Sequence, residues 1–366
     1  MFARKAMRLA LFAGGLLALS ACQELDYGRH LVPLPPAMEA RLERMGLREE
    51  DPIYIRIFKE EGELEVWKQN RDGRFVLLET YEICAWSGEL GPKIREGDRQ
   101  APEGFYTISP AQMNPQSNYY LSFNLGFPNA YDRANGRTGS HLMVHGACSS
   151  AGCYAMTDDQ IAVIYALARE AFSGGQRAFQ VHAFPFRMTP ENMARHRGSP
   201  NFAFWRMLKE GYDHFEATGR PPQVDVCERR YVFDAVTEAR FSPTGACPSF
   251  EVPQTIRERV AARRVADDAA FQVAVARLEE EEAGRRAAEA EATPDATPEQ
   301  APQPATPGDV LIAGDAPVEE PEGASAGTVS TYSGPAVPPP AIPPNAVPSA
   351  EAEEPGVMGR ILGVFR

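Results

Sequence analysis

The side chains best suited to chemistry lie in one short segment, residues 141–153, which reads His-Leu-Met-Val-His-Gly-Ala-Cys-Ser-Ser-Ala-Gly-Cys. It places two imidazoles, His141 and His145, ahead of two thiols, Cys148 and Cys153. These residue types support two kinds of chemistry. They can bind zinc, or an imidazole can assist a thiolate that attacks a carbonyl carbon.

Zinc binding fits the spacing poorly. If residues 141–145 form a strand, His141 and His145 lie on one face but about 13 Å apart. Because ligand atoms sit only about 2 Å from zinc, these imidazoles could not readily share one ion. A helix would bring them together, but Gly146 and the small residues after it disfavour a helix. We therefore predict no metal and no cofactor.

A thiol nucleophile fits the segment better. A strand that ends at His145 can present its imidazole at the edge of a sheet, and the following loop can return Cys153 towards it. An imidazole within hydrogen-bonding distance stabilises the thiolate, which is the reactive species. Gly152 lets the backbone approach closely, and amides near Cys153 could bind an oxyanion. We expect His141 to be a structural histidine.

Many short strands and one clear helix must position this segment. Runs of strand-forming residues between turn signals predict strands at 53–59, 64–67, 75–84, 104–108, 119–125, 141–145 and 179–184. Thr157 and Gln160 form a capping box, and apolar residues at helical spacing then continue to Gly174. The pattern predicts a mainly β domain with packed helices.

The rest of the chain divides by composition. Mixed helical signals predict an α-helical extension, and an Ala/Glu/Arg-rich stretch after it predicts a long helix, either solvated or docked on a partner. We favour the solvated helix. The predicted division is 1–21 signal peptide, 22–51 linker, 52–186 catalytic domain, 187–253 packed extension, 254–292 charged helix and 293–366 tail.

Charge and proline content set the tail apart. The formal net charge is -13, yet residues 279–355 contain 16 Asp and Glu against only Arg285 and Arg286. The remainder is close to neutral, which excludes a globally basic nucleic-acid-binding protein. Residues 293–355 also hold 15 of the 32 prolines. A segment this acidic and proline-rich is predicted to be disordered.

The first residues predict export. Arg4, Lys5 and Arg8 precede an apolar run that is too short for a transmembrane helix, which needs about 20 residues. The run ends in Leu-Ser-Ala-Cys, which resembles the bacterial lipoprotein signal, in which the cysteine, here Cys22, carries the lipid. The residue after the cysteine is Gln23. In this class of signals it is mainly Asp at that position that retains a protein in the inner membrane, so the resemblance implies a lipid anchor in the outer membrane, with the protein on its periplasmic face.

Two motifs resemble one enzyme family. His145-Gly146 followed by Ser150-Ala151-Gly152-Cys153 is similar to the His-Gly…Ser-x-Gly-Cys signature of the L,D-transpeptidase (YkuD-like) catalytic domain. Upstream, Pro-Glu-Gly-Phe-Tyr at 102–106 matches the family's Pro-x-Gly-x-[Tyr/Phe] strand start, and residues 121–124 and 153–158 resemble its YafK-like murein branch. The resemblance spans roughly residues 53–186 and implies the family's β-sandwich domain.

The resemblance also implies roles. Cys153 would be the nucleophile and His145 its general acid/base, while Ser150 and Gly152 would shape the loop and the oxyanion site. The candidate substrate contacts are Gly146, Tyr154 and Arg133.

One position departs from the family pattern, which has Arg two residues after the cysteine. This chain has Ala155 there, so recognition of a substrate carboxylate would fall to another cation. The candidates are Arg133, Arg137 and Lys93, each of which could equally be an ordinary surface charge.

The implied activity is acyl transfer in the bacterial cell wall. The Cys153 thiolate would attack the carbonyl at the L-centre of meso-diaminopimelate in a peptidoglycan stem peptide and form a thioester. An amine acceptor would give transpeptidation. Water would give hydrolysis, for example release of an outer-membrane protein linked to murein, and the departure at Ala155 favours this outcome. The alternative is a non-catalytic cell-wall-binding lipoprotein, although such a protein needs no free thiol in an oxidising compartment.

Setting aside the lipidated and the nucleophilic cysteine leaves four cysteines, which can pair in three ways. We favour Cys227 with Cys247, which closes a turn-rich loop, and then Cys84 with Cys148. Cys148 could instead be a free buried thiol or a resolving partner for Cys153.

Overall fold

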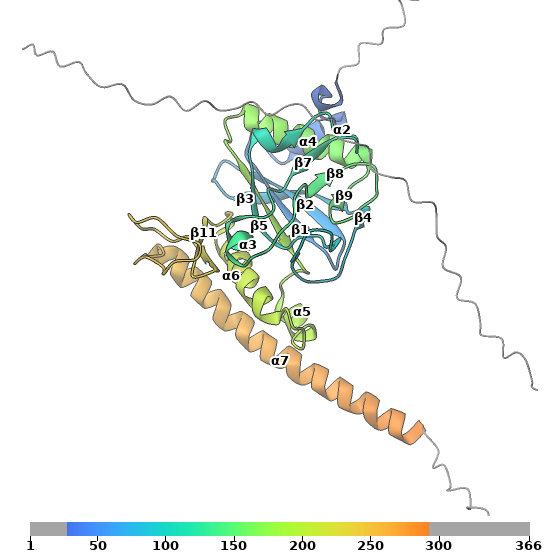
Figure 1. The fold of residues 1–366 in the computed structure, drawn as a ribbon, viewed down its shortest axis with the longest axis vertical. Coiled ribbons are helices and arrows are strands. Elements are labelled where there is room, and N and C mark those ends of the chain that lie inside the picture. Colours follow the sequence, from blue (N-terminus) through green and yellow to red (C-terminus); the bar gives the residue numbers. More distant parts are fainter. Residues whose placement is uncertain (1–27, 293–366) are drawn as a thin grey trace, which may run out of the picture. The chain divides into compact units, whose positions relative to one another are not determined.

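The computed structural model describes residues 28–292 of the 366, with side chains up to residue 289. The predicted signal peptide, the predicted lipidation site Cys22 and the predicted tail at 293–366 lie outside these residues. No helix within the described range is long and apolar enough to cross a membrane. Figure 1 shows two sheets surrounded by helices, one of which extends well beyond the body.

Five strands form the first sheet. In sheet order they are β3 (Phe75–Glu82), β2 (Glu63–Gln69), β1 (Ile53–Phe58), β10 (Phe179–Phe184) and β5 (Gly104–Ile108). The neighbours β1 and β10 run parallel, and the other pairs run antiparallel. Short turns join β1 to β2 and β2 to β3, where Gly62 and Gly73 adopt the positive φ that favours glycine.

Both faces of the first sheet are buried. Successive side chains of a strand point to opposite sides, so Ile55 and Ile57 of β1 face one hydrophobic cluster, while Phe58 faces another. Every residue of β1 is buried. This explains why the strand is apolar on both faces except at Arg56, which is buried and pairs with Glu65 at 2.9 Å.

Five shorter strands form the second sheet. Their order is β4 (Ala85–Trp86), β9 (Tyr154–Ala155), β8 (Met143–His145), β7 (Ser122–Asn124) and β6 (Met113–Asn114). Only β8 and β9 run parallel among these pairs. The strands predicted at 119–125 and 141–145 are shorter than expected, because Tyr120 and His141 have φ of 67° and 55°, outside the β region.

The helix α4 (Asp158–Ser173) packs against both sheets. It begins with the predicted capping box, in which Thr157 Oγ1 accepts from the Gln160 amide at 3.2 Å and Gln160 Oε1 accepts from the Thr157 amide at 3.0 Å. Its fully buried side chains share one cluster with residues of both sheets, and they include Ile161, Ile164, Leu167, Ala168 and Ala171. The helix is therefore the centre of the main core.

The region predicted as a linker, residues 22–51, contains secondary structure. A short 3-10 helix, η2 (Arg29–Leu31), is followed by α2 (Pro36–Arg44). Met38 and Leu42 of α2 are buried in the same cluster as α4. Two more short helices, η3 (Pro110–Gln112) and α3 (Ala130–Ala134), lie between the strands of the catalytic region.

The predicted α-helical extension covers the other face of the first sheet. It consists of α5 (Pro190–Arg195), α6 (Phe202–Thr218) and the hairpin of β11 (Val224–Cys227) and β12 (Arg230–Phe233). The helix α7 (Gln254–Ala292), predicted separately as a charged helix, packs on this extension. Phe58, Phe105 and Phe184 of the sheet share a hydrophobic cluster with Leu208 and Phe233 of the extension. Two mixed sheets with packed helices confirm the predicted fold class.

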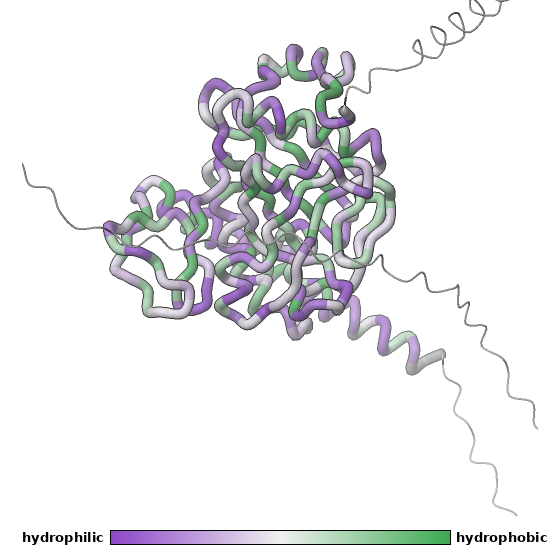
Figure 2. Tube along the Cα trace, turned by 45° about the horizontal axis from the view of Figure 1, so that its top comes forward, coloured by the Kyte–Doolittle hydropathy of each residue, from purple (hydrophilic) through white to green (hydrophobic). Residues whose placement is uncertain are grey.

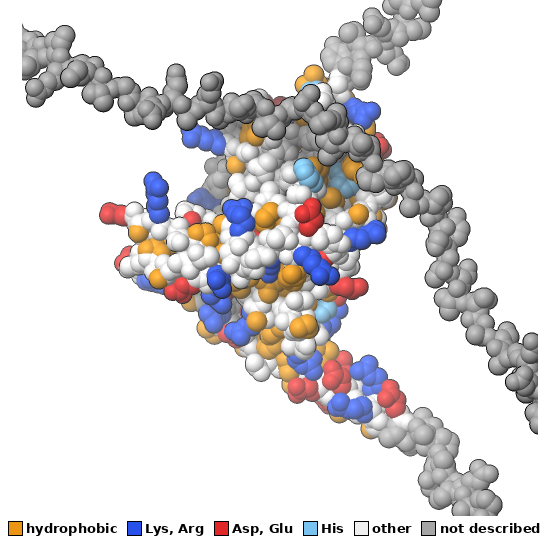
Figure 3. Space-filling view, viewed as in Figure 1, with side chains coloured by type: hydrophobic (Ala, Val, Ile, Leu, Met, Phe, Trp, Pro, Cys, Tyr) orange, Lys and Arg blue, Asp and Glu red, His pale blue; other side chains and the backbone are white. Residues whose placement is uncertain are grey.

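The helix α7 is docked on this chain along part of its length. Ala274 is only 4% exposed, and the ring of Phe271 lies 6.3 Å from that of Phe202. The contacts continue to Glu282, which pairs with Arg197 at 3.4 Å, and the outer end of the helix projects from the body and is largely hydrophilic (Figure 2). Acidic and basic side chains are interspersed on this outer part (Figure 3). The expectation of a solvated helix therefore holds for the outer part alone.

Candidate active site

Strand pairing in the second sheet brings His145 and Cys153 to the same face. In the parallel pair of β8 and β9, His145 is level with Ala155. The same register places Cys153, two residues earlier, level with Met143, and the Met143 amide donates to Cys153 Sγ at 3.4 Å. Because alternate residues of a strand share a face, the imidazole and the thiol emerge on the same side of neighbouring strands.

The outer strands add polar residues to this face. The register of β4 and β9, continued by one residue, places Ser87 opposite Cys153, and β7 places Ser122 opposite His145. The other face of the sheet packs into the core through three fully buried side chains, Phe123, Val144 and Tyr154. One face is therefore structural and the other carries the reactive groups.

The neighbours of His145 set its tautomer. Nδ1 lies 2.6 Å from the carbonyl oxygen of Gly146, and because a carbonyl oxygen only accepts, Nδ1 carries the hydrogen. Nε2 therefore keeps its lone pair and can take up a proton. Burial lowers the pKa of His145, although the hydrogen bond to Gly146 acts in the opposite direction. The ring also contacts that of Tyr119, with a centroid separation of 4.7 Å.

Cys153 is the free thiol among the described cysteines and is half-buried. Its Sγ lies 3.7 Å from the carbonyl oxygen of His141, besides its contact with the Met143 amide. Burial raises the pKa of the Cys153 thiol, and the Met143 amide and the Lys93 ammonium offset this only in part. Within the described chain no hydrogen bond joins this thiol to His145. Burial therefore favours the neutral thiol and the neutral imidazole over the charged pair.

Ser150 shapes the loop that carries the nucleophile. Its Oγ donates to the carbonyl oxygen of Cys153 at 2.7 Å and accepts from the amides of Cys153 at 3.1 Å and Gly152 at 3.3 Å. Gly152 has a φ of 126°, a conformation that favours glycine. The hydroxyl therefore accepts from the amides of both Gly152 and Cys153, which supports the loop-shaping role that the family resemblance implies.

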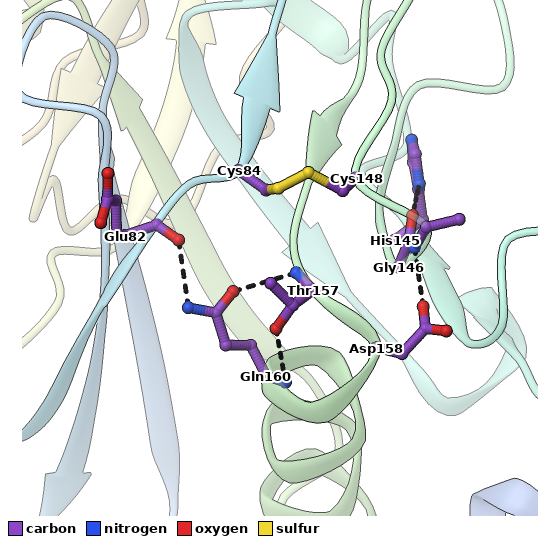
Figure 4. Close-up of a disulfide and its surroundings, with 9 residues drawn as sticks. Glu82, Cys84, His145, Gly146, Cys148, Thr157, Asp158 and Gln160 are labelled. Carbon is purple, nitrogen blue, oxygen red and sulfur yellow. Dashed lines mark hydrogen bonds between the residues drawn. A yellow bond between two sulfur atoms is a disulfide. The ribbon is translucent and has the colours of Figure 1, made fainter.

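The first half of the loop is held by Asp158 and a disulfide (Figure 4). Asp158 Oδ1 accepts from the Ala147 amide at 2.8 Å, and Cys148 is bonded to Cys84, which precedes β4. Ala147 and Cys148 have φ of 62° and 43°. Non-glycine residues keep such conformations only where their surroundings impose them, and these two contacts do so here.

The two disulfides are those that we favoured from the sequence. Cys84 is joined to Cys148 beside the site, and Cys227 is joined to Cys247 in the extension. Cys153 is left with no disulfide partner among the described cysteines. Cys148 is therefore neither a free thiol nor a resolving partner in this structure.

The cations expected near the substrate have other partners. Lys93 is 4% exposed and pairs with Asp98 at 2.5 Å, and Arg137 pairs with Asp132 at 2.9 Å. Arg133 is exposed, and its guanidinium donates to the carbonyl oxygen of Pro128.

Two candidate substrate contacts have structural roles instead. Tyr154 lies on the core face, is fully buried and donates its hydroxyl hydrogen to the carbonyl oxygen of Pro102 at 2.7 Å. Its side chain cannot reach a substrate on the opposite face. A Cβ at Gly146 would lie 2.5 Å from Asp158 Oδ1, so this glycine allows the close packing of the loop.

Two residues beside the nucleophile, Ser87 and Arg99, were not predicted from the sequence. Ser87 lies opposite Cys153 and donates its hydroxyl hydrogen to the carbonyl oxygen of Arg99 at 2.7 Å. Neither Ser87 nor Arg99 belongs to a recognisable motif. Their positions follow from the pairing of β4 with β9, two strands that lie far apart in the sequence, and no local pattern indicates that pairing.

The site as a whole combines a free thiol with a buried imidazole, both on one face of a small sheet. Among the described residues, Nε2 of this imidazole has no hydrogen-bond partner. This combination defines a thiol–imidazole site, the kind that cysteine enzymes use for acyl transfer.

Similarity to known proteins identifies the family of this chain. The family described as YkuD, L,D-transpeptidase catalytic domain, matches residues 52–182. The chain is 48% identical over 198 residues to "Putative L,D-transpeptidase YafK" of Escherichia coli strain K12, a match that covers 54% of this chain and 78% of that protein. The counterpart from Escherichia coli O157:H7 gives the same values. The chain belongs to the L,D-transpeptidase family.

Two solved structures are more distant. A mutant of the helical cell shape determining protein Pgp2 from Campylobacter jejuni is 20% identical, with a TM-score of 0.30 over 52% of this chain and 64% of that chain. Bd1075 from Bdellovibrio bacteriovorus is 22% identical, with a TM-score of 0.27 over 45% of this chain and 60% of that chain. The match covers less than two thirds of each of these two solved chains.

Proposed function

We propose that this chain is a peptidoglycan-modifying enzyme whose Cys153 forms a thioester with the L-centre carbonyl of meso-diaminopimelate in a stem peptide. Family membership supports peptidoglycan as the substrate. The observation that carries the proposal is the placement of Cys153 and His145 on one face of neighbouring strands, with Nδ1 of His145 fixed by a carbonyl.

The first half of the reaction forms the thioester. His145 Nε2 takes the proton from Cys153 Sγ as the sulfur bonds to the carbonyl carbon, and the carbonyl electrons move to its oxygen. When the oxyanion collapses, the carbon–nitrogen bond breaks, and the imidazolium of His145 gives its proton to the leaving amine. Because burial favours the neutral form of both groups, proton transfer accompanies the attack instead of preceding it.

The second half releases the acyl group. His145 takes a proton from the acceptor, the acceptor bonds to the thioester carbon, and the carbon–sulfur bond breaks as Cys153 regains its proton. An amine acceptor gives transpeptidation, and water gives hydrolysis. We favour water, which would release a peptide or a linked protein from murein, because the family's arginine is replaced by Ala155, which is fully buried.

We also propose that the enzyme works on the periplasmic face of the outer membrane, anchored through lipid on Cys22. The signal-like sequence before Cys22 supports this location. The two disulfides among the described residues support it too, because disulfides persist in oxidising compartments such as the periplasm.

Mass spectrometry of muropeptides tests the activity. Purified protein and its Cys153→Ala variant are incubated with isolated peptidoglycan, and the products are compared. New crosslinks would identify a transpeptidase, whereas released stem fragments or released protein would identify a hydrolase. Identical profiles for both proteins would refute the enzyme and favour the non-catalytic cell-wall-binding lipoprotein.

A further inference from the structure

A loop at residues 87–101 forms a second wall beside the nucleophile. It begins at Ser87, opposite Cys153, and returns along the nucleophile loop. The carbonyl carbon of Arg99 and the carbonyl oxygen of Gln100 each lie 3.7 Å from the point where a Cβ on Gly152 would stand. The backbone of this wall therefore contacts the residue that precedes the nucleophile.

A buried lysine holds the wall from inside the fold. Lys59 and Glu103 form an ion pair at 3.0 Å whose side chains are both 0% exposed. The Lys59 ammonium also donates to three carbonyl oxygens of the wall at 2.9–3.0 Å, those of Glu89, Gly91 and Ala101. The wall is thus a fixed part of the site.

The wall has its own internal pairing. Asp98 accepts from the Lys93 ammonium at 2.5 Å and from the amides of Ile94 at 2.9 Å, Arg95 at 2.9 Å and Gln100 at 3.0 Å. These contacts hold the turn that leads into Arg99. They also neutralise Lys93, which is therefore unsuited to binding a second carboxylate.

Arg99 differs from the three cations considered above, Lys93, Arg133 and Arg137, each of which has a partner. It is exposed, and within the described chain its guanidinium has neither an ion pair nor a hydrogen bond. Its φ of 55° is unusual for a non-glycine residue, and the hydroxyl of Ser87 fixes this turn by donating to the Arg99 carbonyl oxygen. The fold therefore holds the backbone of Arg99 beside the nucleophile, while its guanidinium has no partner among the described residues.

We propose that Arg99 binds a carboxylate of the acyl donor next to the carbonyl that Cys153 attacks. A guanidinium presents paired donors that match the two oxygens of a carboxylate, which an ammonium cannot do. The inference rests on the proposed function, since stem peptides carry the carboxylates in question. It makes Arg99 a specificity-determining residue for acidic acyl donors.

Alkylation of Cys153 tests the position of this charge without any substrate. Iodoacetate carries a carboxylate and iodoacetamide carries a neutral amide, and both react with the thiolate. We expect Arg99→Ala to lower the ratio of the iodoacetate rate to the iodoacetamide rate about threefold to fivefold, as loss of one exposed ion pair would. The reaction is run without reductant, so the disulfide-bonded cysteines do not react, and peptide mass spectrometry then measures modification at Cys153.

Arg95→Ala is the matched control. Arg95 is an exposed arginine of the same wall, and its backbone is not among the atoms beside Gly152. We expect its rate ratio to equal that of the unchanged protein, and both variants to melt at the same temperature as that protein. An unchanged ratio in Arg99→Ala, or an equal fall in Arg95→Ala, would overturn the proposal.

Turnover of paired donors tests the specificity. Arg99→Ala should lower kcat/KM about fivefold to tenfold for a stem peptide with free carboxylates, mainly through KM, and leave kcat/KM unchanged for the amidated peptide. Equal losses on both peptides would count against carboxylate binding. If the unchanged protein turns over neither peptide, the proposed function fails, while the alkylation ratio still decides whether Arg99 binds a carboxylate at Cys153.

Discussion

His145 Nδ1 donates to the carbonyl oxygen of Gly146, its own neighbour in the chain, across 2.6 Å. Gly146 is held in turn, because its amide lies within hydrogen-bonding distance of the carbonyl oxygens of Tyr119 at 3.0 Å and Leu121 at 3.2 Å. The orientation of the imidazole therefore depends on the backbone of two segments, residues 145–146 and 119–121. No acidic side chain of the described chain accepts from this imidazole, so the backbone takes the part of the third member in a catalytic triad.

Replacing the reactive pair tests the proposed roles. Cys153→Ala should abolish turnover because it removes the nucleophile. His145→Ala should lower kcat by about 100-fold to 10,000-fold, the usual contribution of a general acid–base. Release of stem fragments, followed over time, measures both effects.

His141→Ala is the control for these variants. His141 is exposed, lies outside β8 and contributes only its carbonyl oxygen to the Cys153 contact. Its loss should leave substantial activity. Activity as low as that of His145→Ala would show that His141 acts in the reaction.

The pH dependence of the site should be that of a neutral pair. Burial lowers the pKa of His145 below its ordinary 6.5, so this base should stay unprotonated as the pH falls to 6.5. The value of kcat/KM should therefore stay constant down to that pH and fall only at lower pH. Burial raises the pKa of Cys153 above its ordinary 9, so alkylation by iodoacetamide should keep rising through pH 9. Alkylation that already reaches its plateau at pH 6 would indicate a preformed thiolate–imidazolium pair instead.

The two disulfides should have separable effects. Replacing Cys84 and Cys148 with serine should lower both the free energy of unfolding, by about 2–4 kcal/mol, and the activity, because this bond holds the loop between His145 and Cys153. Denaturant unfolding and turnover measure the two quantities.

The other disulfide provides the comparison. Replacing Cys227 and Cys247 with serine should lower the free energy of unfolding while the activity per folded molecule stays the same, because this bond lies in the extension. Equal losses of activity in the two double variants would mean that neither bond acts locally.

Lys59 should influence the site through the wall that it holds. Lys59→Met leaves Glu103 buried without its ion-pair partner, which should cost about 3–5 kcal/mol of the free energy of unfolding. It should also loosen residues 87–101, so Cys153 should react faster with iodoacetamide well below the melting temperature.

Lys68→Met is the matched comparison for Lys59. Lys68 is also fully buried, and it donates to the carbonyl oxygens of Glu49 at 2.5 Å and Asp51 at 2.6 Å, away from the nucleophile. Its loss should destabilise the fold and leave the alkylation rate of Cys153 unchanged. The same acceleration in both variants would mean that general loosening, not the wall, governs access to the thiol.

Local patterns were enough to predict the parts of the fold that local forces determine. The capping box at Thr157 and Gln160 starts α4 as predicted, since it needs only residues three positions apart. The strands β1, β5 and β10 of the first sheet follow from runs of β-branched and aromatic residues. The spacing from His145 to Cys153 was recognisable because a single short loop joins the two residues.

Long-range pairing determines what sequence analysis could not reach. Ser87 stands opposite Cys153 only because β4 pairs with β9. Tyr154 adjoins Cys153 in the chain, yet the alternation of the strand turns its ring into the core. His141 lies outside β8 because its backbone turns at a positive φ.

The catalytic region and the extension pack on opposite faces of the first sheet, so the two cannot be separated into independent fragments. The match to the family ends at residue 182, but the core does not end there. Phe58, Phe105 and Phe184 lie between this sheet and the extension, packed in one cluster with Leu208 and Phe233. A fragment cut after residue 186 would present three phenylalanine rings to water and would tend to aggregate. The smallest unit able to fold alone therefore includes α6 and the β11–β12 hairpin, beyond the boundary that the family match suggests.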